Sequence, residues 1–141
     1  MAEESTTPDV VELLRSGFDA LNRRDFDAMP RIFASDAVYD LSSQGLGVYE
    51  GLAAIRALFE EWWSAYDELE SELQEVVDLR NGVFFVALLQ KGRQVGSTAV
   101  VQLLQGWVMV VMDGMVVRVA PDAPDEARAD AERLAQERAD G

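Results

Sequence analysis

Two segments, Val83–Leu89 and Ala99–Met112, are apolar at nearly every position. A strand with one solvated face alternates apolar and polar residues, so these segments predict strands that are buried on both faces. We expect helices to cover one face of the sheet. The simplest cover for the other face is the sheet of a second subunit, so the pattern predicts a homodimer formed through the sheet.

Tight turns separate the segments of strand character. Asn81-Gly82 and Asp113-Gly114 are typical hairpin turns, and a further turn signal lies in Lys91–Gly96. The strands expected around these turns are, in chain order, Leu73–Leu79, Val83–Gln90, Thr98–Met112 and Met115–Ala120. A short strand, Val38–Leu41, comes earlier and is followed by a glycine-bearing loop. Because tight hairpin turns join antiparallel strands, the sequence predicts a mainly antiparallel sheet.

Helical periodicity dominates the region before this meander. Apolar residues recur at helical spacing from Val10 to Leu21 and from Ile55 to Tyr66, and a shorter pattern joins Phe26 to Phe33. Pro30 lies inside the shorter pattern, where it removes a backbone hydrogen bond, so we expect a kink or a 3₁₀ stretch there.

The predicted fold class is α+β, with three N-terminal helices packed on a curved, mainly antiparallel sheet and a charged C-terminal helix. We expect residues 1–8 to form a disordered tail, residues 9–122 to form one domain, and residues 123–141 to form a helix lying on the surface.

Charge and composition exclude several kinds of chemistry. The net charge of -14 repels phosphate backbones and anionic membranes, so we expect neither as a partner. Without cysteine or histidine, acid–base work falls to carboxylates, tyrosine or lysine. We expect no metal and no cofactor, and we interpret the acidic side chains between Glu70 and Asp78 as a solvated sheet edge. The chain has no apolar run of membrane-spanning length, which is typical of a cytoplasmic protein.

Three segments resemble a known family: Phe18–Ala28, Gly47–Gly51 leading into Ile55-Arg56, and Asp113–Arg118. Together with the element order, they resemble the SnoaL-like group of the nuclear transport factor 2-like superfamily, over about Val10 to Ala120. The resemblance implies a cone closed by helices, with a pocket for a small hydrophobic or polyketide-like molecule. That superfamily includes isomerases, cyclases, dehydratases, epoxide hydrolases and proteins without known catalysis.

The active residues of the ketosteroid isomerase relatives do not carry over. The position of their oxyanion-hole tyrosine falls at Gly17, the second aspartate falls near Trp107 or Val108, and the base falls at Leu41. Asp40 stands one residue before the base position, and a shift of one residue along a strand moves a side chain to the other face.

Asp40 is nevertheless the leading catalytic candidate, because a carboxylate in an apolar cavity gains a raised pKa and can act as a base. It would move a proton next to a carbonyl, with Gln102 or Tyr39 donating to the oxygen. Alternatively, Asp40 is solvated or caps the turn Ser42–Gly45.

The remaining candidates are ligand-binding residues. Gln102 and Gln105 interrupt an apolar strand and should lie on opposite faces, while the aromatic stripe is either core or pocket wall. The candidates are Tyr39, Tyr49, Phe59, Trp63, Gln102 and Gln105. Three functions stay open: isomerase- or cyclase-type proton transfer, ligand binding without catalysis, and a dimeric interaction module.

Overall fold

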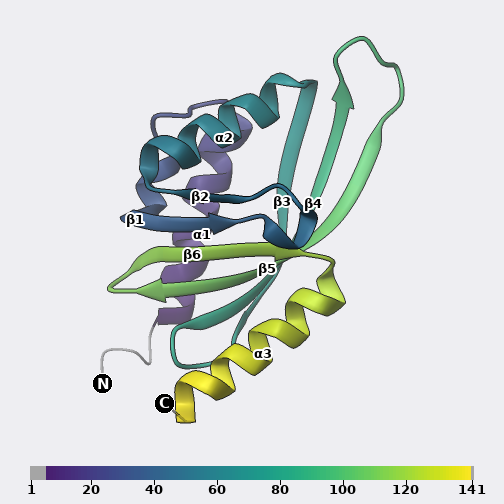
Figure 1. Ribbon diagram of the computed structural model, residues 1–141. Helices are drawn as coiled ribbons and strands as arrows, with labels where there is room; N and C mark the ends of the chain where they lie inside the picture. Colours follow the sequence, from purple (N-terminus) through teal and green to yellow (C-terminus); the bar gives the residue numbers. More distant parts are fainter. Residues whose placement is uncertain (1–5, 141) are drawn as a thin grey trace.

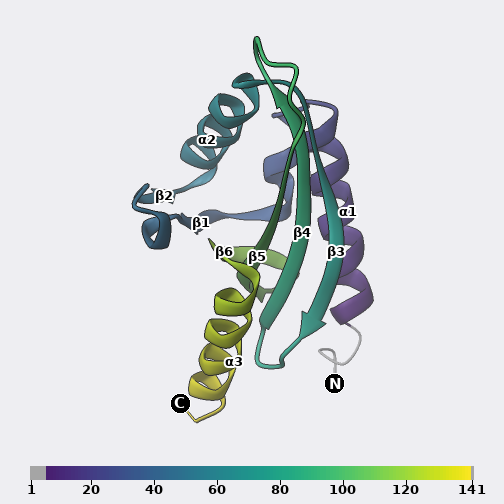
Figure 2. The same ribbon diagram turned by 90° about the vertical axis from the view of Figure 1, so that its right-hand side faces the viewer.

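One curved sheet of six strands organises the protein, and helices cover both of its faces (Figures 1 and 2). The computed structural model describes residues 6–140. The helices are α1 (Thr6–Asn22), α2 (Leu52–Ser64) and α3 (Pro124–Asp140), with short 3₁₀ turns η2 (Met29–Ile32) and η3 (Ser42–Gln44). The strands are β1 (Phe33–Asp40), β2 (Val48–Glu50), β3 (Tyr66–Asp78), β4 (Val83–Gln94), β5 (Val101–Met112) and β6 (Met115–Asp122).

The strand order is β2-β1-β6-β5-β4-β3, and only the pair β1–β6 is parallel. The predicted α+β class and the mainly antiparallel sheet are therefore confirmed. Both predicted hairpin turns form. Asn81 has a φ of 60° and Gly82 one of 79°, while Asp113 and Gly114 have 53° and 78°. Turns of this kind need left-handed backbone, which asparagine, aspartate and glycine adopt at the lowest cost.

The expectation of three N-terminal helices is wrong. Only α1 and α2 precede the meander, and the middle pattern forms the 3₁₀ turn η2, with Pro30 near its start. Proline suits the beginning of a helical turn but cannot continue a helix, so the chain leaves the turn at Phe33 and enters β1. The apolar spacing of this segment instead reflects burial of Met29, Pro30 and Ile32.

Several boundaries differ from those expected. β1 and β3 begin at Phe33 and Tyr66, earlier than expected, because their exposed sides carry charged residues that obscure the apolar pattern. α1 begins at Thr6, so the end of the predicted tail is helical, while residues 1–5 lie outside the described part of the chain.

The inner face of the sheet, defined here as the face under α1 and α2, carries the main core. Leu14 and Phe18 of α1 and Ile55, Phe59 and Trp63 of α2 pack there. The sheet contributes alternate residues to the same core, namely Phe84, Val86, Leu88, Trp107, Met109 and Val119. This period of two places the intervening residues of β4 and β5 on the outer face.

The outer face is partly covered by α3 of the same chain. Ala127, Ala131 and Ala135 form a buried stripe that packs on Val83, Phe85, Ala87 and Val108. Small side chains allow close approach: a Cβ at Gly106 would lie 2.8 Å from the Cβ of Ala127. α3 is therefore a structural cover as well as a surface helix, and the homodimer stays a prediction.

Candidate functional site

Tyr39 projects into the core beneath α2. It is 1% exposed, and its ring lies 5.2 Å from that of Phe59 and 6.1 Å from that of Trp107, in edge-to-face contacts. Burial raises the pKa of the Tyr39 phenol well above its ordinary value, and the Trp107 indole offsets only part of that rise. The phenol therefore stays protonated at neutral pH and can donate a hydrogen bond but cannot act as a base.

Asp40, the next residue, lies on the outer face, away from this core. Its carboxylate accepts hydrogen bonds from the Ser42 hydroxyl at 2.5 Å and the Ser42 backbone N–H at 2.9 Å, and it forms an ion pair with Arg118. The Ser42 hydroxyl, the Ser42 N–H and Arg118 hold the pKa of Asp40 below its usual range, against the opposing effect of burial. Asp40 therefore caps the turn after β1, and the raised pKa that a base in an apolar cavity would need is absent.

Three buried polar atoms of the inner core have no hydrogen-bond partner among the described residues. They are Nε1 of Trp63, Nε1 of Trp107 and Oε1 of Gln105. The Trp107 N–H lies close enough to the Tyr39 phenol to lower its pKa, but it makes no hydrogen bond of normal geometry to it. Gln105 pairs with Leu88 across the β4–β5 ladder and lies two residues before Trp107, so both side chains belong to the inner face. An unpaired buried donor or acceptor costs roughly 1–3 kcal/mol, so each of these three atoms lowers the stability of the folded core.

The β4–β5 register decides which predicted polar residues can reach the core. It runs unbroken from Val83↔Val110 to Gly92↔Val101, so Gln102 faces outward, where it is exposed opposite Lys91. Gln105 is 6% exposed and faces inward. The two glutamines therefore lie on opposite faces, as expected, and only Gln105 joins the aromatic cluster.

The aromatic candidates divide between the centre of the core and its margin. Phe59 lies 5.9 Å from Trp63, and both are buried. Tyr49 pairs with Tyr39 across β1–β2 and packs on the core from its margin. Trp107 was missed as a site residue, although its position two residues after Gln105 on a strand was a usable signal.

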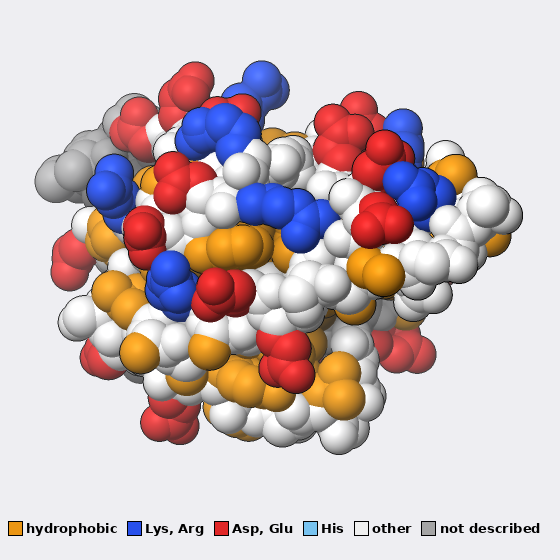
Figure 3. Space-filling view, turned by 90° about the horizontal axis from the view of Figure 1, so that it is seen from above, with side chains coloured by type: hydrophobic (Ala, Val, Ile, Leu, Met, Phe, Trp, Pro, Cys, Tyr) orange, Lys and Arg blue, Asp and Glu red, His pale blue; other side chains and the backbone are white. Residues whose placement is uncertain are grey.

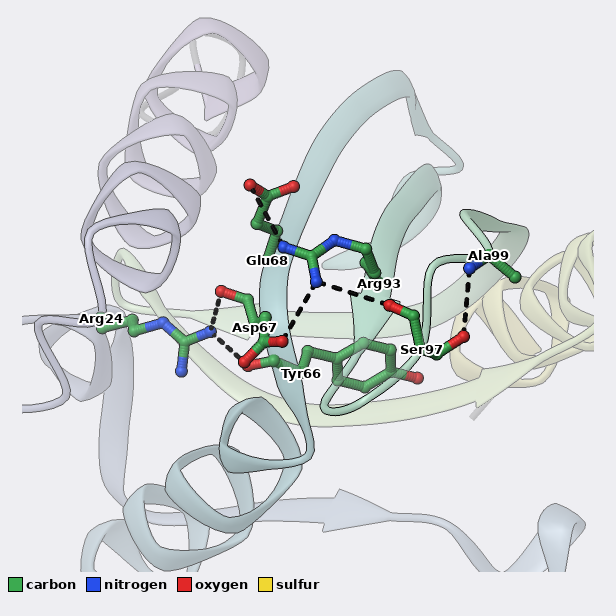
Figure 4. Close-up of polar contacts among 7 residues, drawn as sticks. All are labelled: Arg24, Tyr66, Asp67, Glu68, Arg93, Ser97 and Ala99. Carbon is green, nitrogen blue, oxygen red and sulfur yellow. Dashed lines mark hydrogen bonds and ion pairs between the residues drawn. The ribbon is translucent and has the colours of Figure 1, made fainter.

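An open cleft of about 490 Å³ lies between the end of α1, β3 and β4, and Figure 4 shows polar contacts around it. Arg24 donates to the carbonyl oxygens of Trp63 at 3.0 Å and Tyr66 at 2.8 Å. Arg93 pairs with Asp67 at 3.1 Å and Glu68 at 3.6 Å. Arg24 thus joins the end of α1 to the α2–β3 turn, and Arg93 joins β4 to β3. Both arginines are paired with groups of the same chain, so we interpret their role as structural.

A curved sheet that wraps around an aromatic core and is closed by helices defines the nuclear transport factor 2-like fold. The family model of the SnoaL-like domain matches residues 14–119, and the chain belongs to that family. Among the described residues, we find no helix with the length and apolar character to cross a membrane.

Solved structures agree on the fold. TerC, co-crystallised with polyporic acid, has a TM-score of 0.70 at 14% identity, covering 90% of this chain and 99% of its own. A ketosteroid isomerase-like protein from Catenulispora acidiphila, in complex with trimethylamine, has a TM-score of 0.71 at 11% identity, with 85% and 92% covered. An epoxide hydrolase-like protein from M. tuberculosis has 0.66 at 15% identity, with 92% and 93% covered. Among curated proteins, none matches the sequence significantly.

Proposed function

We propose that the protein binds a small, uncharged, mainly apolar molecule in the inner core without transforming it. The observation that carries the proposal is that three buried polar atoms, on Trp63, Gln105 and Trp107, have no hydrogen-bond partner among the described residues on the inner, aromatic face of the sheet. A ligand with one acceptor and one donor would satisfy an indole N–H and the glutamine carbonyl. Its apolar part would replace contacts that the aromatic side chains now make with one another.

The ionisable groups argue against proton transfer in this core. The buried polar side chains among the described residues include Ser71, Gln90 and Gln105, but no carboxylate, lysine or arginine is buried there. The Tyr39 phenol faces the core but is held protonated by burial. With Asp40 on the outer face, the inner core presents hydrogen-bond donors and acceptors rather than a base.

The absence of charge in the core also predicts the chemical class of the ligand. An ionised ligand would lose its hydration without gaining a counter-charge, which costs several kcal/mol. A neutral aromatic molecule would meet ring edges and the indole donors instead. The structurally similar TerC, co-crystallised with polyporic acid, supports a fold of this kind holding an organic molecule.

The test is binding of a panel of neutral aromatic compounds, from phenol to 1-naphthol, followed by tryptophan fluorescence and thermal unfolding. We expect at least one compound to stabilise the protein and to alter the emission. Gln105→Leu should weaken that binding about tenfold or more, whereas Gln102→Leu on the outer face should leave it unchanged. Equal binding by both variants would contradict the proposed site.

A carboxylate-bearing analogue of the best compound gives a further control. It should bind much more weakly, because no cation among the buried residues can pair with it. If no neutral compound shifts the unfolding temperature, the core is simply filled by its own side chains and the ligand proposal is wrong.

A further inference from the structure

The hairpin formed by β4 and β5 extends beyond β6 (Figures 1 and 2), while β3 accompanies β4 to its end, where Tyr66 pairs with Gln94. β5 pairs with β4 from Val101 to Val110, but its pairing with β6 starts only at Gly106, opposite Asp122. On that side, residues 101–105 pair with no other strand of the described chain. They form a free strand edge, which we name the β5 edge.

The β5 edge is apolar and exposed. Val101, Leu103 and Leu104 are 48%, 49% and 49% exposed, and the neighbouring Val100 is 70% exposed. The chain has 26 acidic and 12 basic residues, yet none lies between Gln94 and Met112. Seen from above, the projecting end on the right of Figure 3 is mainly white and orange, with charged groups gathered beside it.

The other edges of the sheet are built differently. β3 carries Glu68, Glu70, Glu72 and Glu75 along its length, and β2 has only three residues. Short strands and charged side chains are the usual protection of an edge against pairing with another chain. The β5 edge lacks both protections, so it is the edge best suited to accept another strand.

We propose that the β5 edge pairs antiparallel with the same edge of a second copy of this chain, to form one continuous sheet across a two-fold axis. In a two-fold contact the same patch is buried on both copies, so a patch that carries charges of one sign only would repel itself. In a chain of net charge -14, this uncharged segment is where two copies can meet without such repulsion.

This arrangement differs from the face-to-face dimer expected from sequence and does not depend on ligand binding in the core. In edge pairing, side chains from both faces of β5 flank the new strand pair. Leu103, opposite Gln90, belongs to the inner face, and Leu104, opposite Leu89, belongs to the outer face. Both should therefore matter, whereas a dimer packed through the outer face would depend on Leu104 alone.

The first experiment is sedimentation equilibrium of the full chain over micromolar concentrations at several salt concentrations. We expect a dimer that tightens as salt rises, because salt screens the repulsion between two acidic bodies. Leu103→Lys and Leu104→Lys should each raise the dissociation constant at least tenfold, although each lowers the net negative charge. Met112→Lys, at the other end of β5 with 52% exposure and the same charge change, is the matched control and should leave it unchanged.

Hydrogen exchange then separates edge pairing from other contacts. The amides of residues 101–105 that point away from β4 should become protected as the protein concentration rises, because the alternate amides already bond to β4. The proposal is overturned if the protein stays a monomer at every concentration, or if Met112→Lys raises the dissociation constant as much as the two leucine substitutions do. It is also overturned if Leu104→Lys weakens the dimer and Leu103→Lys does not, or if the amides of residues 101–105 that point away from β4 stay unprotected in the dimer. Dimerisation that weakens with salt would point to a charge-driven contact elsewhere and would overturn it as well.

Discussion

Tyr39 and Asp40 are adjacent in the chain, but their side chains lie on opposite faces of β1. Tyr39 pairs with Val119 in the parallel β1–β6 ladder and packs in the inner core. Asp40 lies on the outer face, where it pairs with Arg118 and Ser42. A change of one position along this strand thus separates a buried, protonated phenol from an ionised, paired carboxylate.

Asp40→Asn should reduce stability at neutral pH by about 1–3 kcal/mol, because the carboxylate accepts charge-assisted hydrogen bonds. The folded pKa of Asp40 is lowered, so its contribution is present above the unfolded pKa of about 4 and is lost as pH falls through the folded pKa. Denaturant unfolding between pH 2 and pH 7 should show the wild type and the variant converging at low pH. Asp36→Asn, exposed on the same strand, is the control, and a constant difference at every pH would contradict this assignment.

Gln105→Leu should increase stability by roughly 1–2 kcal/mol in the absence of ligand, because it removes a buried carbonyl that has no partner. Gln90→Leu provides the comparison. Gln90 is also buried on the inner face, but it donates to the Ser71 hydroxyl at 3.2 Å, so its loss should destabilise the protein. Urea unfolding of both variants checks the difference in sign. Destabilisation by Gln105→Leu would mean that its amide has a partner in solution.

Ala131→Leu should destabilise the protein by about 1–3 kcal/mol, because Ala131 is fully buried between α3 and the outer face of the sheet. Ala129→Leu, exposed on the same helix, should change stability by less than about 0.5 kcal/mol. Thermal unfolding of the pair measures how tightly α3 is held. Equal, small effects would show that α3 does not pack on the sheet in solution.

Arg24→Ala should destabilise the α2–β3 turn, since the guanidinium donates to the carbonyl oxygens of Trp63 and Tyr66. Arg24 also has a φ of 60°, in the left-handed region, where glycine is less strained than other residues. Arg24→Gly should therefore be more stable than Arg24→Ala by about 1 kcal/mol. Unfolding of the two variants separates the backbone effect from the side-chain effect, and the reverse order would contradict the assignment.

Much of the site could be anticipated from residue type. The aromatic stripe of α2 indicated that Phe59 and Trp63 pack either in the core or in a pocket wall, and the polar interruptions at Gln102 and Gln105 indicated positions on opposite faces of one strand. The face of Asp40 could not be settled in the same way, because it depends on the pairing of β1 with a strand almost eighty residues away. Likewise, which of Gln102 and Gln105 faces the core depends on the register of β5 with β4.

The sequence by itself determined the long helices, the strands of the meander, the two hairpin turns and the α+β class, because periodicity and turn chemistry act between near neighbours. Tertiary structure alone decided that α3 covers part of the outer face and that β5 extends past β6 to leave a free edge. It also decided that Asp40 faces Arg118 rather than the core. These outcomes depend on register and on contacts between distant segments, which short-range patterns do not encode.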